Sequence, residues 1–399
     1  MTHVPRAVVD GGCIPMDRRA WSMKPLDASP LRWLAWVVAC LTITSPTAVA
    51  ADRPVTGRHE PGFEPLDEAV LAFMDLIGCR AATVAVSRDG RLLLSRGYGW
   101  SGSDDSTPVA PDALLRIASV TKPITAAAVK NAVRAGRLSL DTKAFDLVSV
   151  GVPSDRVADP RVRRVTVGHL LDHQGGWDRD VSFDPMARTP WIQQESRSSI
   201  PPGPKEVIAF MLARPLDFSP GDKTAYSNFG YCVLGRVLES VYERPYFECI
   251  RQTVCEPLGI DDIRLGRADP AHRGPREVSY PAAGEAVPLD VMDAHGGLVA
   301  SAPALCRFLD AYWLSGEPRP RGDLANWTIM GSLPGTTALV RQRPDGINVA
   351  VLFNGRRDRH FREDNGRLQE TLDEAVGRCR TDQIPARNQA SAPDQPSPP

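Results

Sequence analysis

Residues 116–123, Arg-Ile-Ala-Ser-Val-Thr-Lys-Pro, are the stretch from which the rest of the chain can be interpreted. Ser119 is the only serine with a lysine, Lys122, three positions later. If the segment opens a helix, this spacing places both side chains on one face of its first turn. A nearby amine can take the proton of a serine hydroxyl, and a helix N-terminus can stabilise the oxyanion that follows attack. The alternative is a solvated helix start without chemistry.

Composition restricts the class of protein. The chain has 399 residues, 42% hydrophobic and 24% charged, which suits one large domain or two intimately packed ones. A net charge of -1 gives no reason to expect nucleic acid or an anionic surface as partner. Few of the basic residues are lysines, so a lysine three positions after a serine is less expected by chance.

The N-terminus has the pattern of an export signal. Arg32 precedes a short apolar run at 33–43, and the small residues Ala48-Val49-Ala50 follow it. We therefore expect residues 1–50 to be an N-terminal extension and signal peptide, and the mature protein to be periplasmic or secreted. The run is too short for a transmembrane span. Val37-Val38-Ala39 before Cys40 also resembles a lipoprotein site, so a lipid anchor at Cys40 is the competing prediction.

Strand-like segments occur near both ends of the remaining chain. Residues 51–62 resemble a linker, 66–77 have helical spacing, and Asp89-Gly90 separates two strand-like runs in a hairpin pattern. A second hairpin is predicted around 344–346, a closing helix at 361–376, and a disordered tail at 381–399. These patterns predict an α+β fold, an α/β sandwich with an antiparallel sheet built from 63–118 and 295–380. A mainly helical region, 119–294, is inserted, and the whole domain covers 63–380.

The inserted region has helical patterns at 122–133, 207–212, 231–242 and, just beyond it, 303–314. Residues 174–204 are expected to be a long irregular excursion of the kind that borders binding sites. His169 and His173 have the i, i+4 spacing of metal ligands, but the glutamate of a His-Glu-x-x-His site is absent, so local packing is favoured.

The cysteines show no metal or redox spacing. The six that follow the signal region could pair in ways that the sequence does not determine, such as Cys249 with Cys255, or remain buried thiols. They are Cys79, Cys232, Cys249, Cys255, Cys306 and Cys379.

A second motif, Tyr226-Ser227-Asn228, follows 107 residues after Ser119. A phenol beside a lysine ammonium is a plausible base, and an amide next to it can orient the lysine and a substrate carbonyl. The competing interpretation is a loop tyrosine, with Asn228 capping a helix that begins at Phe229.

Ser-x-x-Lys followed by Tyr-x-Asn resembles the serine β-lactamase and penicillin-binding-protein superfamily, most nearly its class C-like esterase and peptidase branch. Further segments share this resemblance, which spans about residues 64–376; they are 135–141, 170–176, 219–231, 296–301 and 331–336.

The resemblance implies roles for individual residues. Ser119 would be acylated, with Lys122 and Tyr226 as acid and base, and Asn228 would orient substrate. The backbone N–H groups of Ser119 and Ser332, the latter beside Gly331 on an edge strand, would form the oxyanion hole. No metal or organic cofactor is implied.

The third motif departs from the family pattern. Where the family carries Lys or His, then Thr, then Gly, this chain has Ile329, Met330 and Gly331. Ile329 cannot bind a substrate carboxylate, which favours uncharged esters or amides over β-lactams and carboxypeptidase substrates. His295 is a conceivable substitute cation, although a structural role is favoured for it.

Three hypotheses follow. The leading one is an exported serine hydrolase acting on a small ester, amide or peptidoglycan-like peptide through an acyl-enzyme. The second is a binding or scaffolding protein of the same fold with weakened catalysis. The third, a metallohydrolase using His169 and His173, is the least favoured. The sequence does not determine the oligomeric state.

Overall fold

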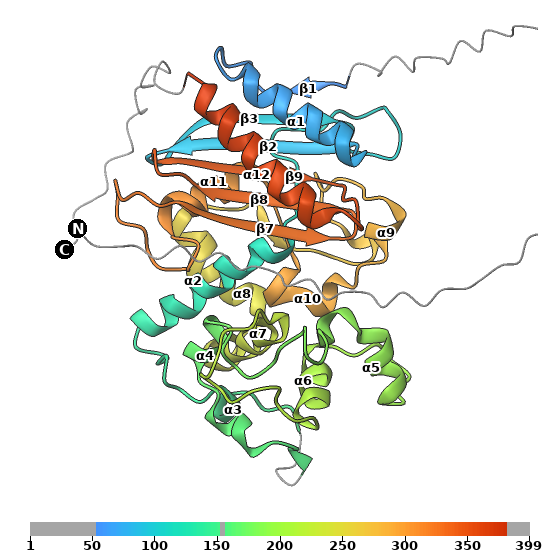
Figure 1. Ribbon diagram of the computed structural model, residues 1–399, viewed down its shortest axis with the longest axis vertical. Coiled ribbons are helices and arrows are strands. Elements are labelled where there is room, and N and C mark those ends of the chain that lie inside the picture. The colour runs from blue at the N-terminus through green and yellow to red at the C-terminus, as the bar shows by residue number, and fades with distance from the viewer. Residues whose placement is uncertain (1–52, 152–155, 381–399) are drawn as a thin grey trace, which may run out of the picture. The chain divides into compact units, whose positions relative to one another are not determined.

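Six antiparallel strands form the main sheet of the computed structural model, which describes residues 53–151 and 156–380 (Figure 1). The strand order is β1-β3-β2-β9-β8-β7, so segments from both ends of the domain alternate in one sheet. Its strands are β1 (Val55–Thr56), β2 (Ala81–Arg88), β3 (Arg91–Gly99), β7 (Trp327–Leu333), β8 (Thr336–Gln342) and β9 (Ile347–Phe353). The predicted signal region with Cys40 and the predicted tail lie outside the described residues.

Helices cover both faces of this sheet. Helices α1 (Glu64–Ile77) and α12 (Phe361–Arg378) pack on one face, and α11 (Ala302–Ala311) packs on the other (Figure 1). Alternating side chains of β2 therefore belong to two separate cores, with Val84 and Val86 facing α1 and α12 and Ala85 facing the helical region. The predicted α+β sandwich is confirmed.

Both predicted hairpins are present. Strands β2 and β3 are joined at Asp89 and Gly90, whose φ angles of 53° and 77° match the two left-handed positions of a tight hairpin turn. Strands β8 and β9 pair across the second turn, and Asn348 lies opposite Gln342.

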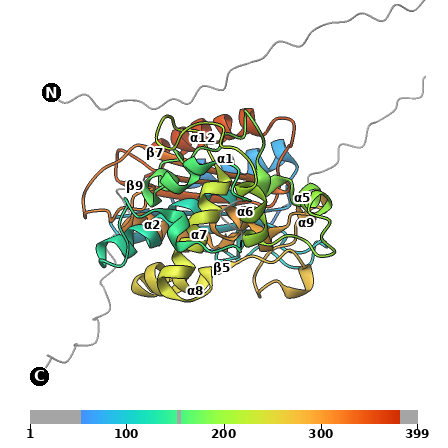
Figure 2. The ribbon, with the colours of Figure 1, turned by 90° about the horizontal axis from the view of Figure 1, so that it is seen from below.

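The inserted region is helical and packs below the sheet in the view of Figure 1. Its centre is a group of three mutually packed helices, α2 (Thr121–Arg134), α7 (Asn228–Tyr242) and α10 (Leu289–Gly296). Seen from below, α7 passes close to α2 (Figure 2). The other helices of the region are α3 (Ala144–Leu147), α4 (Val167–Leu171), α5 (Thr189–Glu195), α6 (Pro204–Leu212), α8 (Tyr246–Ile250) and α9 (Ala282–Glu285).

Several local expectations require correction. The expected linker contributes the edge strand β1, which pairs with β3. The excursion at 174–204 contains α5 and the 3₁₀ turn η4 (Pro185–Ala187). A small second sheet was not anticipated; it joins β4 (Leu115–Arg116), β6 (Leu298–Ala300) and β5 (Ile263–Leu265). Short pairings such as these carry little periodicity, so the sequence gives no clear sign of them.

The six cysteines at positions 79–379 are all unpaired thiols, so of the two alternatives left open by the sequence, unpaired thiols and bridges such as Cys249–Cys255, the structure has the first. Five of them are buried. None of the helices in 53–151 and 156–380 has the length and apolar content needed to cross a membrane.

Candidate active site

Ser119 lies at the junction between the sheet and the helical region. It occupies the 3₁₀ turn η1 (Ala118–Val120), and α2 begins directly after it at Thr121. The preceding residue, Ala118, has a left-handed φ of 47°, a conformation that is costly for a residue with a Cβ. Backbone strain is therefore located beside the hydroxyl, and Lys122 follows within the first turn of α2.

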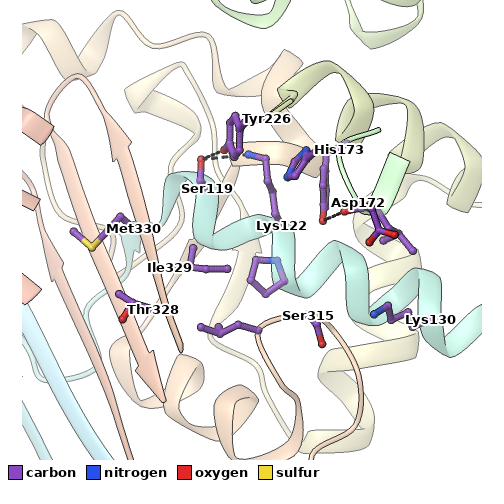
Figure 3. Close-up of a pocket in the computed structure, with 14 residues that line it drawn as sticks. Ser119, Lys122, Lys130, Asp172, His173, Tyr226, Ser315, Thr328, Ile329 and Met330 are labelled. Carbon is purple, nitrogen blue, oxygen red and sulfur yellow. Dashed lines mark hydrogen bonds between the residues drawn. The ribbon is translucent and has the colours of Figure 1, made fainter. Parts of the chain in front are cut away.

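The two sequence motifs meet in space. The Ser119 Oγ lies 2.7 Å from the Tyr226 Oη, and the Lys122 Nζ donates a hydrogen bond to the same Oγ at 3.2 Å (Figure 3). A hydroxyl, an amine and a phenol from distant parts of the chain thus lie within hydrogen-bonding distance. This arrangement can remove a proton from a nucleophile and return one to a leaving group.

Lys122 is almost fully buried and has two further acceptors. Its Nζ donates to the Asn228 Oδ1 and to the backbone carbonyl of His295, both at 2.7 Å. Burial lowers the pKa of the ammonium below its ordinary value of 10.5, an effect that Tyr226 partly opposes. A lower pKa makes the neutral amine, the form that can act as a base, more accessible.

His295 does not supply the missing cation. Its side chain is 1% exposed, and burial holds its pKa well below 6.5, so the ring is neutral. The contribution of His295 to the site is its carbonyl oxygen, which binds Lys122. The structural role favoured from the sequence is the one observed.

Aromatic and cationic groups surround the ring of Tyr226. The His173 ring centroid lies 4.8 Å from the Tyr226 centroid, and the guanidinium of the exposed Arg179 lies 4.7 Å from it. His173 accepts a hydrogen bond from the Ser227 N–H through its Nδ1, and burial lowers its pKa to about 4. A neutral His173 therefore fixes the backbone next to Tyr226.

Asn228 is not the cap of its helix, contrary to the competing interpretation. The Ser227 side chain caps α7 by accepting from the Gly230 N–H, which leaves Asn228 at the first helical position. From there its amide reaches Lys122 on one side and Asp184 on the other. Neither Asp184 nor Arg179 was identified from the sequence; the only signal was the irregular stretch that contains them.

Strand β7 forms the opposite side of the site and is one of the two edge strands of the main sheet, at the end away from β1. A Cβ added to Gly331 would lie 2.1 Å from the carbonyl oxygen of Ile117, so only glycine allows the strand to approach η1 this closely. This close approach places Gly331 beside the turn that carries Ser119, and Ser332 follows it. In an edge strand, alternate backbone N–H groups have no hydrogen-bond partner within the sheet. A backbone N–H that stabilises an oxyanion must be free in this way.

A pocket of about 420 Å³ opens beside these groups. Ile329 projects from β7 toward the helix that carries Lys122 (Figure 3), and Pro123 and Leu314 line the same pocket. At the far end lies Lys130, whose Nζ is 2.9 Å from a carboxylate oxygen of Glu317. The position that carries a cation or imidazole in the family pattern is thus an apolar wall in this protein.

The two histidines proposed as metal ligands have separate local roles. The His169 Nδ1 accepts from the Thr166 N–H in the capping box of α4, whereas His173 binds Ser227. In the described part of the chain, no three His, Cys, Asp or Glu side chains are grouped to hold a metal ion. The metallohydrolase hypothesis therefore lacks a ligand set there.

Comparison with known proteins agrees with this geometry. The sequence matches the Beta-lactamase family over residues 66–348, well over half of the chain. The chain therefore belongs to the β-lactamase family, and the predicted family is confirmed.

Two curated relatives illustrate the range of the family. "Probable fimbrial assembly protein FimD, serogroup H1" of Dichelobacter nodosus is 34% identical over 152 residues, which are 37% of this chain and 34% of that protein. Esterase EstB of Burkholderia gladioli is 31% identical over 235 residues, 56% of this chain and 57% of the esterase. The chain thus spans between about a third and three fifths of these relatives.

Among solved structures, the D-amino acid amidase of Ochrobactrum anthropi SV3 complexed with L-phenylalanine has the same fold. Its TM-score is 0.57 at 20% identity, covering 78% of this chain and 99% of the amidase.

Proposed function

We propose that the protein is a serine hydrolase that cleaves a small ester or amide through an acyl-enzyme on Ser119. The observation that carries this proposal is the contact of the Ser119 Oγ with both the Tyr226 Oη and the Lys122 Nζ. Membership of the β-lactamase family supports the class of reaction, and similarity to an esterase and the fold of an amidase support the two substrate classes.

In this mechanism the Ser119 Oγ attacks the substrate carbonyl carbon while its proton passes to Lys122 or Tyr226. The backbone N–H groups of Ser119 and Ser332 stabilise the oxyanion. The leaving group takes a proton from Tyr226 or Lys122 and departs, and a water molecule deprotonated by the same pair hydrolyses the acyl-enzyme. Asn228 orients Lys122 and the substrate.

The substrate we propose is uncharged and apolar next to the scissile bond. Ile329, Pro123 and Leu314 line the same pocket as Ser119, and Ile329 offers no charge to a substrate carboxylate. Burial of apolar surface is worth roughly 25 cal/mol per Å², so a hydrophobic group in this part would contribute to binding. A peptidoglycan-like peptide with a free carboxylate fits this wall less well.

Labelling with a fluorophosphonate tests the proposal. We expect one adduct per chain, located at Ser119, and none on Ser119→Ala. Hydrolysis of short-chain nitrophenyl esters, nitrocefin and D-Ala-D-Ala peptides then distinguishes substrate classes, with the neutral esters turned over fastest. Equal labelling of Ser119→Ala would reject the assignment.

The second candidate is a binding or scaffolding protein with weakened catalysis, which the loss of a cation at Ile329 favours. It predicts neither adduct nor ester turnover in the wild-type protein, together with ligand binding in the same pocket. The labelling experiment therefore separates it from the hydrolase.

We also propose that the protein is exported, on the basis of Arg32, the apolar run at 33–43 and the small residues before position 51. Mass spectrometry of the mature N-terminus tests this. Cleavage after Ala50 supports a periplasmic or secreted protein, a lipid on Cys40 supports the anchored form, and an uncleaved N-terminus in the cytosol contradicts both.

A further inference from the structure

Asp184 contacts one of the groups that hold the amine. Its Oδ2 accepts a hydrogen bond from the Asn228 Nδ2 at 2.5 Å, and its Oδ1 accepts from the backbone N–H of Met186 at 3.0 Å, which caps η4. An ionised carboxylate has no hydrogen to donate, so Asn228 must turn its NH₂ group toward Asp184. The amide oxygen of Asn228 therefore faces Lys122.

This orientation decides what the Lys122 nitrogen can do. The Lys122 Nζ is hydrogen-bonded to three groups, and two of them, the Asn228 Oδ1 and the His295 carbonyl, only accept hydrogen bonds. A neutral amine has two N–H groups and one lone pair. Because both N–H groups are used by these acceptors, the lone pair is left for the third neighbour, the Ser119 Oγ. With the amide of Asn228 turned round, its NH₂ group would compete for that lone pair.

We propose that Asp184 is a positioning residue that fixes the amide of Asn228 and thereby directs the lone pair of Lys122 to Ser119. The proposal rests on the hydrolase function proposed above and concerns how its base is oriented. Asp184 does not touch the reacting atoms.

The charges around Lys122 also bear on its protonation. Asp184 and Tyr226 favour the ammonium form, whereas burial and Arg179 disfavour it. Other titratable neighbours are His173 and His295, whose own charged forms Lys122 opposes, and Tyr231, whose ring centroid lies 5.7 Å from the Lys122 Nζ. Asp184 is thus the one carboxylate among these groups facing the amine.

The first test is the labelling rate of Asp184→Asn as a function of pH. Labelling forms a bond between the Ser119 Oγ and phosphorus, releases fluoride, and passes the hydroxyl proton to Lys122. The asparagine introduced at position 184 has a single acceptor oxygen. When that oxygen accepts from the Met186 N–H, the NH₂ group of the new side chain faces Asn228. This favours the rotated amide of Asn228, in which its NH₂ group points toward Lys122. We expect the rate to fall by about 10-fold, less than the roughly 10²–10⁴-fold that general base catalysis supplies, because the base is misdirected and not removed.

Two control variants separate this effect from folding. Asp184→Ser keeps a capping oxygen for Met186 but is too short to hold Asn228, so we expect an unchanged melting temperature and a reduced rate. Asp180→Asn removes a carboxylate from an exposed position of the same segment and should leave the rate unchanged.

Exchanging the two side chains gives the sharpest test. In the double variant Asp184→Asn with Asn228→Asp, an acceptor again faces Lys122 and every hydrogen bond regains a partner. We expect recovery of at least part of the lost rate, with the acid limb of the pH profile moved to higher pH because the carboxylate now adjoins Lys122.

A wild-type rate in Asp184→Asn, or no recovery in the exchange variant, would overturn the role of Asp184. Failure of the wild-type protein to label at all would instead reject the hydrolase function.

Discussion

The two walls of the pocket differ in chemistry. On the helical wall, Ser119, Lys122, Tyr226 and Asn228 form a continuous hydrogen-bonded group. On the strand wall, Ile329 presents a hydrocarbon surface. The groups that would make and break the acyl bond are thus fully assembled, while the position that would select a charged substrate is apolar. The comparison indicates that bond chemistry and substrate choice are carried by separate elements and can be changed separately.

The largest expected effect is on the helical wall. Lys122→Met retains the length and the apolar stem of the side chain but removes the amine. We expect labelling to slow by about 10³-fold, because general base catalysis is lost. Thermal stability should change little, since the end of the desolvation of the amine offsets the loss of its hydrogen bonds to Asn228 and His295. Labelling kinetics and thermal melting measure both quantities, and Lys130→Met at the far end of the pocket is the matched control. A wild-type rate in Lys122→Met would contradict the assignment of this wall.

The same wall should make stability depend on pH through His173. Its pKa is about 4 in the folded protein against an ordinary 6.5, so between these values the unfolded state binds more protons. The contribution of His173 to the free energy of unfolding is therefore fully present above pH 6.5. It falls by up to about 3 kcal/mol as the pH is lowered toward 4.

Urea unfolding at a series of pH values measures this dependence. His173→Asn, which tolerates the left-handed φ of 58° at this position, should flatten the curve over that window. The exposed His272→Asn serves as control and should reproduce the wild-type slope. An unchanged slope in His173→Asn would assign the acid sensitivity to other groups.

A third prediction concerns how the strand wall is held against the helical wall. In Gly331→Ala the new Cβ would meet the Ile117 carbonyl oxygen, so β7 must move away from η1. A misplacement of about 1 Å near the reacting atoms costs on the order of 10²-fold in rate, and we expect a loss of that size in labelling. Gly366→Ala, in an exposed turn of α12 with open space around it, should label normally and gain about 0.5–1 kcal/mol in stability.

Prediction from sequence succeeded where periodicity or a fixed spacing carried the information. The helices at both ends, the Asp89-Gly90 hairpin and the Ser119–Lys122 pair all depend on residues close together in the chain. It failed where a contact depends on which loops meet. Asp184 and Arg179 lie in a segment without periodicity, and their proximity to Asn228 and Tyr226 is set by the packing of α7 against its neighbours. The strand β1 is two residues long, too short to show alternation.

The smallest expected effect comes from a substitution that changes the charge of the strand wall and leaves the helical wall unchanged. Ile329→Lys restores a cation at the position where the family pattern has one, facing the pocket beside Pro123. For substrates that carry a carboxylate we expect kcat/KM to rise by up to about 5-fold, which corresponds to about 1 kcal/mol for one partly solvated charge pair. For neutral esters we expect a fall by a smaller factor. Ile329→Leu, which changes shape but not polarity, should leave the preference as it is. Steady-state rates for a matched pair of esters, one neutral and one with a terminal carboxylate, give the comparison. If the lysine variant gains nothing on the acidic ester while still labelling at Ser119, selectivity for charge must be set elsewhere, and Arg179 beside Tyr226 becomes the next residue to change.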